Sequence, residues 1–193
     1  MVGWRFNTML RRDVRRPAMR KLNPIRWLRV VPIAALSGGL SAAAAAPRAA
    51  RVEAPAAFGV ADRDAILVVH AAGAQIYECK AGAGGEMSWV FREPVATLVR
   101  DGLAIGHHYV GPTWELNDGD AVTGRQSASA PGATPDDVAL LRLDAVEHRG
   151  GGILKDAKLV LRLNTHGGVL KGECPNAGEL RAEPYSADYA FLR

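Results

Sequence analysis

The residue types best suited to chemistry gather in one short segment, residues 106–120. Histidines, a tyrosine, a tryptophan and acidic residues stand there among glycines and a proline. His107 and His108 are adjacent, so in a strand their side chains point to opposite faces and only one can enter a given site. Loops carried by a rigid sheet are where binding and catalytic groups usually lie. We therefore treat this segment as the candidate site.

Three arrangements would make this segment functional. His108 and Glu115 could form an acid–base pair in which each group tunes the proton affinity of the other. The same two residues could bind a metal ion together with His166, through nitrogen and oxygen. Alternatively, Trp114 could form the floor of a ligand pocket, with His108 and Glu115 as polar anchors. Structural roles are also open for these residues: Trp114 in a core, Glu115 as a hydrogen-bond acceptor at a turn, and His108 as a buried histidine.

The signatures of several enzyme classes are absent from the sequence. A dinucleotide-binding turn requires G-x-G-x-x-G, but Gly82-x-Gly84 is followed by Met87 where the third glycine belongs. The nucleophile elbow G-x-S-x-G, the phosphate-binding P-loop and the zinc helix H-E-x-x-H do not occur. We predict no cofactor and no metal, and we assign no catalytic residue beyond the candidates His108 and Glu115.

Short strands must position these residues. Turn residues recur every 8–15 positions, for example Asp101-Gly102 and residues 117–120, and residues 75–80 and 158–164 alternate between apolar and polar. This pattern predicts an all-β fold, an antiparallel sandwich or barrel of about 8–10 short strands with little helix. We expect a break at residues 71–73, one helical turn over residues 93–98, and a strand over residues 138–148, where a helix is the alternative.

The beginning of the chain has the layout of a secretory signal peptide. Residues 26–47 run from a short basic stretch through an apolar run to a block of alanines, and the apolar run is too short to span a bilayer as a helix. We assign residues 1–46 to a signal peptide, with Met19 as an alternative start. Residues 47–60 are interpreted as a flexible lead-in and residues 61–193 as a single β domain.

Charge and cysteine content agree with export. Residues 1–46 hold nine of the 24 Lys and Arg residues and one of the 20 acidic residues, so their removal leaves 15 basic and 19 acidic residues and a net charge of about −4. The remaining basic residues form no stripe, which argues against nucleic-acid binding.

Cys79 and Cys174 are the only cysteines, and in an oxidising compartment an even pair indicates a disulfide. We expect a secreted or periplasmic protein without a membrane span after processing.

Several blocks of residues are similar to a known family. They are residues 75–79 (QIYEC), residues 106–119 with His108 and Glu115, residues 162–168 with Cys174 after them, and residues 184–189 at the end. Over roughly residues 61–192 the chain resembles the exported bacterial and fungal family catalogued as domain of unknown function 3455. The family offers no established activity or catalytic residues. Because His108 belongs to one of these blocks, we choose it over His107.

Three functional interpretations remain open. The first is an exported β domain that binds a small molecule or a partner in the cell envelope, with Trp114, Tyr109, Asn164 and His166 as candidate ligand-binding residues. The second is a hydrolytic enzyme that uses His108 and Glu115. The third is a structural envelope protein without a pocket.

Overall fold

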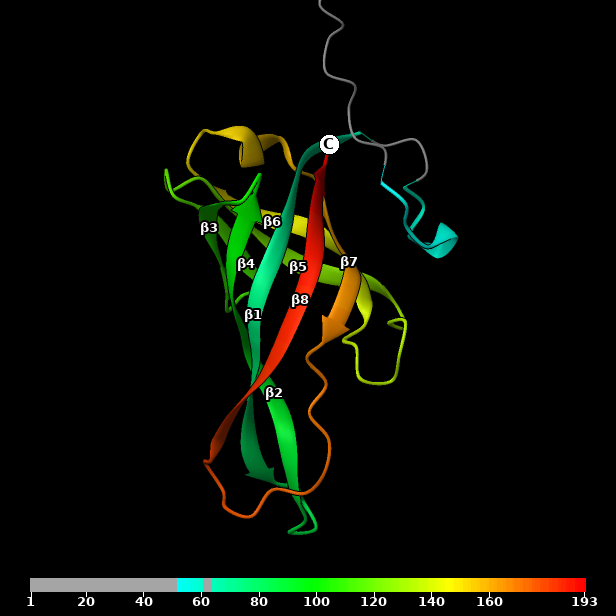
Figure 1. Ribbon diagram of the computed structural model, residues 1–193, viewed down its shortest axis with the longest axis vertical. Helices are drawn as coiled ribbons and strands as arrows, with labels where there is room; N and C mark the ends of the chain where they lie inside the picture. Colours follow the sequence, from blue (N-terminus) through cyan, green and yellow to red (C-terminus); the bar gives the residue numbers. More distant parts are fainter. Residues whose placement is uncertain (1–51, 61–63) are drawn as a thin grey trace, which may run out of the picture. The chain divides into compact units, whose positions relative to one another are not determined.

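The computed structural model describes residues 52–60 and 64–193 of the chain (Figure 1). One antiparallel sheet contains all of the strands. Each strand pairs with its neighbours in sequence, and the last strand pairs with the first, so the sheet closes into a barrel. The predicted all-β fold is confirmed, and of the two predicted architectures the barrel is the one observed. The strands are β1 (Ala65–Ala81), β2 (Met87–Arg100), β3 (Leu103–Tyr109), β4 (Thr113–Leu116), β5 (Ala121–Ala130), β6 (Leu140–Arg149), β7 (Leu159–Gly167) and β8 (Leu180–Leu192).

Two local predictions are wrong, because β1 and β2 run on where a break and a helical turn were expected. β1 passes through residues 71–73 without interruption. Gly73 permits this, since a side chain at that position would collide with the carbonyl oxygen of Val95 on the neighbouring strand. Pro94 lies within β2 opposite Gln75, next to a bulge after Ile76 that accommodates the missing N–H. The strand predicted over residues 138–148, with a helix as the alternative, is confirmed by β6.

One end of the barrel is packed and closed. Leu67, Val69 and Leu98 are buried in the interior together with Phe191. The short 3₁₀ turn η2 (Ile153–Asp156), which lies at the top of Figure 1, adds Leu154, which is fully buried. The buried carboxylate of Asp120 holds this turn by accepting hydrogen bonds from the backbone N–H groups of Gly152 and Leu154 (2.9 and 2.7 Å).

A second apolar cluster lies on the outside of the barrel. Leu159, Leu161 and Leu163 share one face of β7, as the alternation predicts, but this face points outward. Residues 52–60, which the sequence interpretation assigned to the lead-in, pack against it, and Phe58 in the 3₁₀ turn η1 (Ala56–Phe58) is fully buried there. Arg142 secures the segment by donating a hydrogen bond to the Phe58 carbonyl (2.9 Å). Residues 1–51, including the expected signal peptide, lie outside the described residues.

The opposite end of the barrel is extended by a hairpin. β1 and β2 continue to Ala81 and Met87, and the start of β8 pairs with the same part of β1. Cys79 on this extension forms a disulfide with Cys174 in the connection between β7 and β8, with a Cα–Cα distance of 5.7 Å. The bond ties a long connection to the hairpin, next to the end of the barrel that η2 does not close.

Replacing both cysteines with serine should destabilise the domain. The disulfide joins positions 95 residues apart, so its loss releases a long loop in the unfolded chain and should lower the free energy of unfolding by about 4 to 5 kcal/mol in the chain-entropy estimate. Urea unfolding of wild-type and double-serine protein measures the difference. Equal unfolding midpoints and slopes would contradict this role.

Candidate functional site

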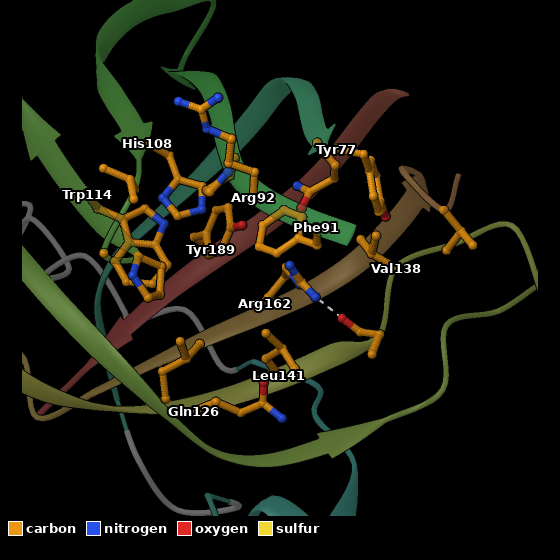
Figure 2. A pocket seen from close by; sticks show the side chains of 18 residues that line it. Tyr77, Phe91, Arg92, His108, Trp114, Gln126, Val138, Leu141, Arg162 and Tyr189 are labelled. Carbon is orange, nitrogen blue, oxygen red and sulfur yellow. Dashed lines mark hydrogen bonds between the residues drawn. The ribbon is translucent and has the colours of Figure 1, made fainter. Parts of the chain in front are cut away.

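A cavity occupies the part of the barrel that the core leaves unfilled. Its volume is about 530 Å³, and its lining side chains come from all parts of the sheet (Figure 2). Along β1, Leu67, Val69 and Ala71 belong to the packed core, whereas Gln75 and Tyr77 line the cavity. The lining residues are Gln75, Tyr77, Phe91, Arg92, Pro94, His108, Val110, Gly111, Pro112, Trp114, Gln126, Val138, Ala139, Leu141, Leu143, Arg162, Val169 and Tyr189.

Three aromatic rings form one wall of the cavity. His108 and Trp114 are paired across β3 and β4, and their rings stack with centroids 4.6 Å apart and planes within 4°. The ring of Tyr189, from β8, meets both edge-on at 4.9 and 5.1 Å. Trp114 and Tyr189 are each 1% exposed. Such tight contacts fix the ring orientations, so this wall is rigid before any ligand arrives.

His108 is held as a neutral ring with a defined tautomer. Its Nδ1 lies 2.9 Å from the carbonyl oxygen of Thr113. Because a carbonyl only accepts hydrogen bonds, Nδ1 must carry the proton and donate it, which leaves Nε2 of the neutral ring without one. Burial lowers the pKa of His108 to about 4; the hydrogen bond to Thr113 opposes this shift and the positive charge of Arg162 adds to it. At neutral pH the ring is uncharged.

Arg162 brings a positive charge into the cavity. It is paired with Tyr189 across β7 and β8, and Figure 2 shows its side chain among Phe91, Tyr189 and Leu141. Its Nε donates a hydrogen bond to the carbonyl of Ala139 (2.9 Å). None of the lining residues is Asp or Glu, and within the described part of the chain no ion pair involves Arg162. The other lining arginine, Arg92, is half-exposed and already pairs with Glu93 (3.2 Å).

Two further donors lack partners in the cavity wall. Trp114 Nε1 and Gln75 Nε2 are buried, and neither makes a hydrogen bond within the protein that meets ordinary geometry. Gln75 is 2% exposed and lies close enough to the Tyr185 hydroxyl to oppose slightly the rise in that group's pKa, which burial causes. Buried polar groups are normally hydrogen-bonded. The cavity therefore offers N–H donors that the protein itself does not satisfy.

Glu115 and Tyr109 lie on the outside of the barrel. In the register of β3 and β4, Glu115 pairs with His107 rather than His108. The Tyr109 hydroxyl donates to Glu115 (2.6 Å), and Arg149 forms an ion pair with the same carboxylate. Both interactions lower the pKa of Glu115, with the hydrogen bond from Tyr109 contributing most. The structure therefore brings His108 together with Trp114 but not with Glu115, and the acid–base pair is not assembled.

A bulge turns Asn164 and His166 away from the cavity. Strict alternation from Arg162 would point both of them inward. Asn164 instead has a positive φ of 47°, and the register with β8 shifts between Leu163 and His166. Both residues are exposed, and Asn164 donates a hydrogen bond to Asp188 on the outer surface (2.8 Å). The expected ligand-binding roles of Tyr109, Asn164 and His166 thus gain no support from the cavity.

The arrangement proposed for a metal is likewise not assembled. His108 faces the interior, whereas Glu115 and His166 lie outside. Within residues 52–60 and 64–193 no group of three or more His, Cys, Asp or Glu side chains is placed to hold a metal ion. The polar cavity-lining residues that the sequence analysis did not select are Arg162 and Gln75. Each belongs to one of the family-like blocks, and this was the signal that could have pointed to them.

The neutral state of His108 should make stability depend on pH. The unfolded chain takes up this proton near pH 6.5 and the folded domain only near 4, so the unfolded state binds more protons between these values. Stability is fully present above pH 6.5 and falls towards pH 4, by on the order of 3 kcal/mol. Urea unfolding across this range should show a shallower decline for His108→Phe than for wild type. His166→Phe, at an exposed site, should keep the wild-type slope; the same slope in His108→Phe would refute the assignment.

The comparisons with known proteins identify the family. A family model described as "Protein of unknown function (DUF3455)" matches residues 60–104 and 100–193. Searches among curated proteins and among solved structures found no match. The model covers the whole barrel, including every residue that lines the cavity, and the chain belongs to the DUF3455 family.

Proposed function

We propose that this domain binds a small, largely apolar molecule inside its barrel. The observation that carries the proposal is the cavity of about 530 Å³ lined mainly by aromatic and aliphatic side chains. Eight-stranded barrels have an interior just wide enough to be filled by side chains or to hold one small ligand. Ligand pockets are typically 300–1,000 Å³ in volume and combine apolar walls with a few polar groups. This cavity fits both descriptions.

The entrance of the cavity supports the proposal. Phe91 is 49% exposed and Val110 is 55% exposed, and both belong to the cavity lining. Large apolar side chains that remain in contact with water at the mouth of a pocket gain free energy when a ligand covers them. Further inside, the aromatic wall of His108, Trp114 and Tyr189 is buried and rigid. A ligand would enter past this apolar rim and stop against that wall.

The rival interpretations are less well supported. A hydrolase that uses His108 and Glu115 requires the two side chains to act on one substrate, but they lie on opposite faces of the sheet. A structural protein without a pocket would be expected to fill the barrel with side chains, as η2 and its neighbours do at the closed end. Binding to a partner in the envelope remains an alternative that the apolar residues at the entrance would equally serve.

A neutral dye should report the cavity directly. Nile red should bind wild-type protein saturably with increased fluorescence. Leu141→Trp places an indole in the cavity and should weaken binding by at least roughly tenfold, about 1.4 kcal/mol. Val146→Trp makes a similar change on the same strand at a half-exposed position outside the cavity and should bind as wild type does. Thermal unfolding checks that both variants fold. No saturable binding by wild type, or equal binding by both variants, would contradict the proposal.

We also propose that the domain is exported. The Cys79–Cys174 disulfide supports this, since disulfides persist in oxidising compartments and are rare in the cytosol. The order of basic, apolar and alanine-rich stretches over residues 26–47 supports it independently. In the part of the chain that the structure describes, no helix is long and apolar enough to cross a membrane.

Expression of the full chain in a bacterium with fractionation tests export. The mature protein should appear outside the cytoplasm with an N-terminus between residues 44 and 48, and should resist alkylation at both cysteines until it is reduced. Mass spectrometry reads the N-terminus and the thiol state in one sample. Recovery of the unprocessed chain in the cytosol with two alkylated cysteines would refute export.

A further inference from the structure

We infer that the ligand carries a carboxylate, or a monoanionic group of the same shape, that pairs with Arg162 inside the barrel. This inference rests on the proposed binding function and specifies its chemistry. The ligand is then an amphipathic acid with its anionic end towards Arg162 and its apolar body along the aromatic and aliphatic walls.

The charge of Arg162 has no counter-ion in the cavity. The lining residues include no Asp or Glu, and Glu115 and Asp188 engage partners on the outer surface. Glu183 lies opposite Gln75 on β8 and its charge reaches Tyr77, but it forms no ion pair with Arg162. The field of Arg162 reaches the neighbouring rings, since it affects the pKa values of Tyr77, His108 and Tyr189. Arg162 is half-buried, and a cation partly surrounded by apolar and aromatic side chains gains free energy when an anion lies beside it. A ligand anion supplies that compensation.

The geometry of Arg162 selects a planar, two-oxygen acceptor. Its Nε donates a hydrogen bond to the Ala139 carbonyl, and this bond fixes the position of the guanidinium. Arg162 also forms a hydrogen bond with the Tyr189 hydroxyl, which opposes the rise in that group's pKa that burial causes. The guanidinium carries further N–H donors, and these match the two oxygens of a carboxylate. Phosphate sites generally combine several charges or backbone amides, whereas the other lining arginine here is paired with Glu93. One fork in an apolar cavity favours a monoanion.

The unpartnered donors point to the same chemistry. Gln75 Nε2 and Trp114 Nε1 are buried N–H groups in the cavity wall that make no hydrogen bond of ordinary geometry within the protein. Like Arg162, they can donate to an oxygen atom of a ligand. These donors complement a molecule that brings oxygen acceptors.

Competition against Nile red tests the inference with a matched pair of probes, decanoic acid and decanamide, at pH 7.5. The two have the same chain, and only the acid is charged. The wild-type protein should prefer the acid by roughly 10- to 100-fold, as expected for hydrogen bonds to a charged group. In Arg162→Met the preference should fall to within about threefold, while Nile red still binds. Arg162→Lys keeps the charge and loses the fork, so its preference should lie between the two.

Arg125→Met is the matched control, because it removes an arginine from an exposed position on β5 that does not line the cavity. It should keep the wild-type preference. Equal competition by acid and amide in wild type, or an unchanged preference in Arg162→Met and Arg162→Lys, would overturn the inference and leave the proposed binding function intact. Failure of Nile red to bind wild-type protein would instead overturn the proposed function. If Arg162→Met does not fold, the comparison of Arg162→Lys with wild type decides.

Discussion

The pairing of β8 with β1 is the constraint on which the rest of the structure depends. It closes the sheet into a barrel, so along the closed part every second side chain enters one shared interior. At one end the interior is filled by aliphatic side chains and capped by η2, which Asp120 holds in place. At the other end β1, β2 and β8 run past the barrel, and the Cys79–Cys174 bond fastens the β7–β8 connection to them. The unfilled interior thus lies towards the end that carries the disulfide, and not towards the end that η2 closes.

Closure of the barrel also determines the charge and the hydrogen bonds of polar side chains that face the interior. His108 is accommodated as a neutral ring because its Nδ1–H donates a hydrogen bond to the Thr113 carbonyl and Trp114 stacks on its face. Arg162 cannot lose its charge, and its hydrogen-bond partners are the Ala139 carbonyl and the Tyr189 hydroxyl, neither of which is charged. The two residues therefore differ: His108 is buried and gives up its charge, whereas Arg162 is half-buried and keeps a charge that no lining carboxylate compensates. Arg162 is therefore the residue whose charge can select a ligand.

The sequence predicted the fold class well and the site only in part, for a definable reason. Alternation in β7 showed that Leu159, Leu161 and Leu163 share a face, but alternation cannot tell an inner face from an outer one when both are apolar. Here the outer face is covered by residues 52–60, and Phe58 lies against it. The intervening Arg162 therefore points inward, where a charged residue is not expected. His108 and Trp114 were selected because they stand in the aromatic and polar segment that resembles the family, and the register of β3 and β4 brings them together. The bulge at Asn164, which moves His166 outside, leaves no clear signal in the sequence.

Comparison with Arg142 shows that Arg162 lacks a counter-ion because it faces the interior, and not because of its position along the sheet. The two arginines lie on paired strands, where Arg162 is opposite Leu141 and Arg142 is opposite Leu161. Arg142 points outward, and there it donates to the Phe58 carbonyl and lies 3.6 Å from the carboxylate of Asp144. The outer surface thus supplies an acid to its arginine, and the cavity does not. Arg162 is half-buried and has no counter-ion in the cavity, so a domain that keeps it there gains stability whenever an anion binds beside it.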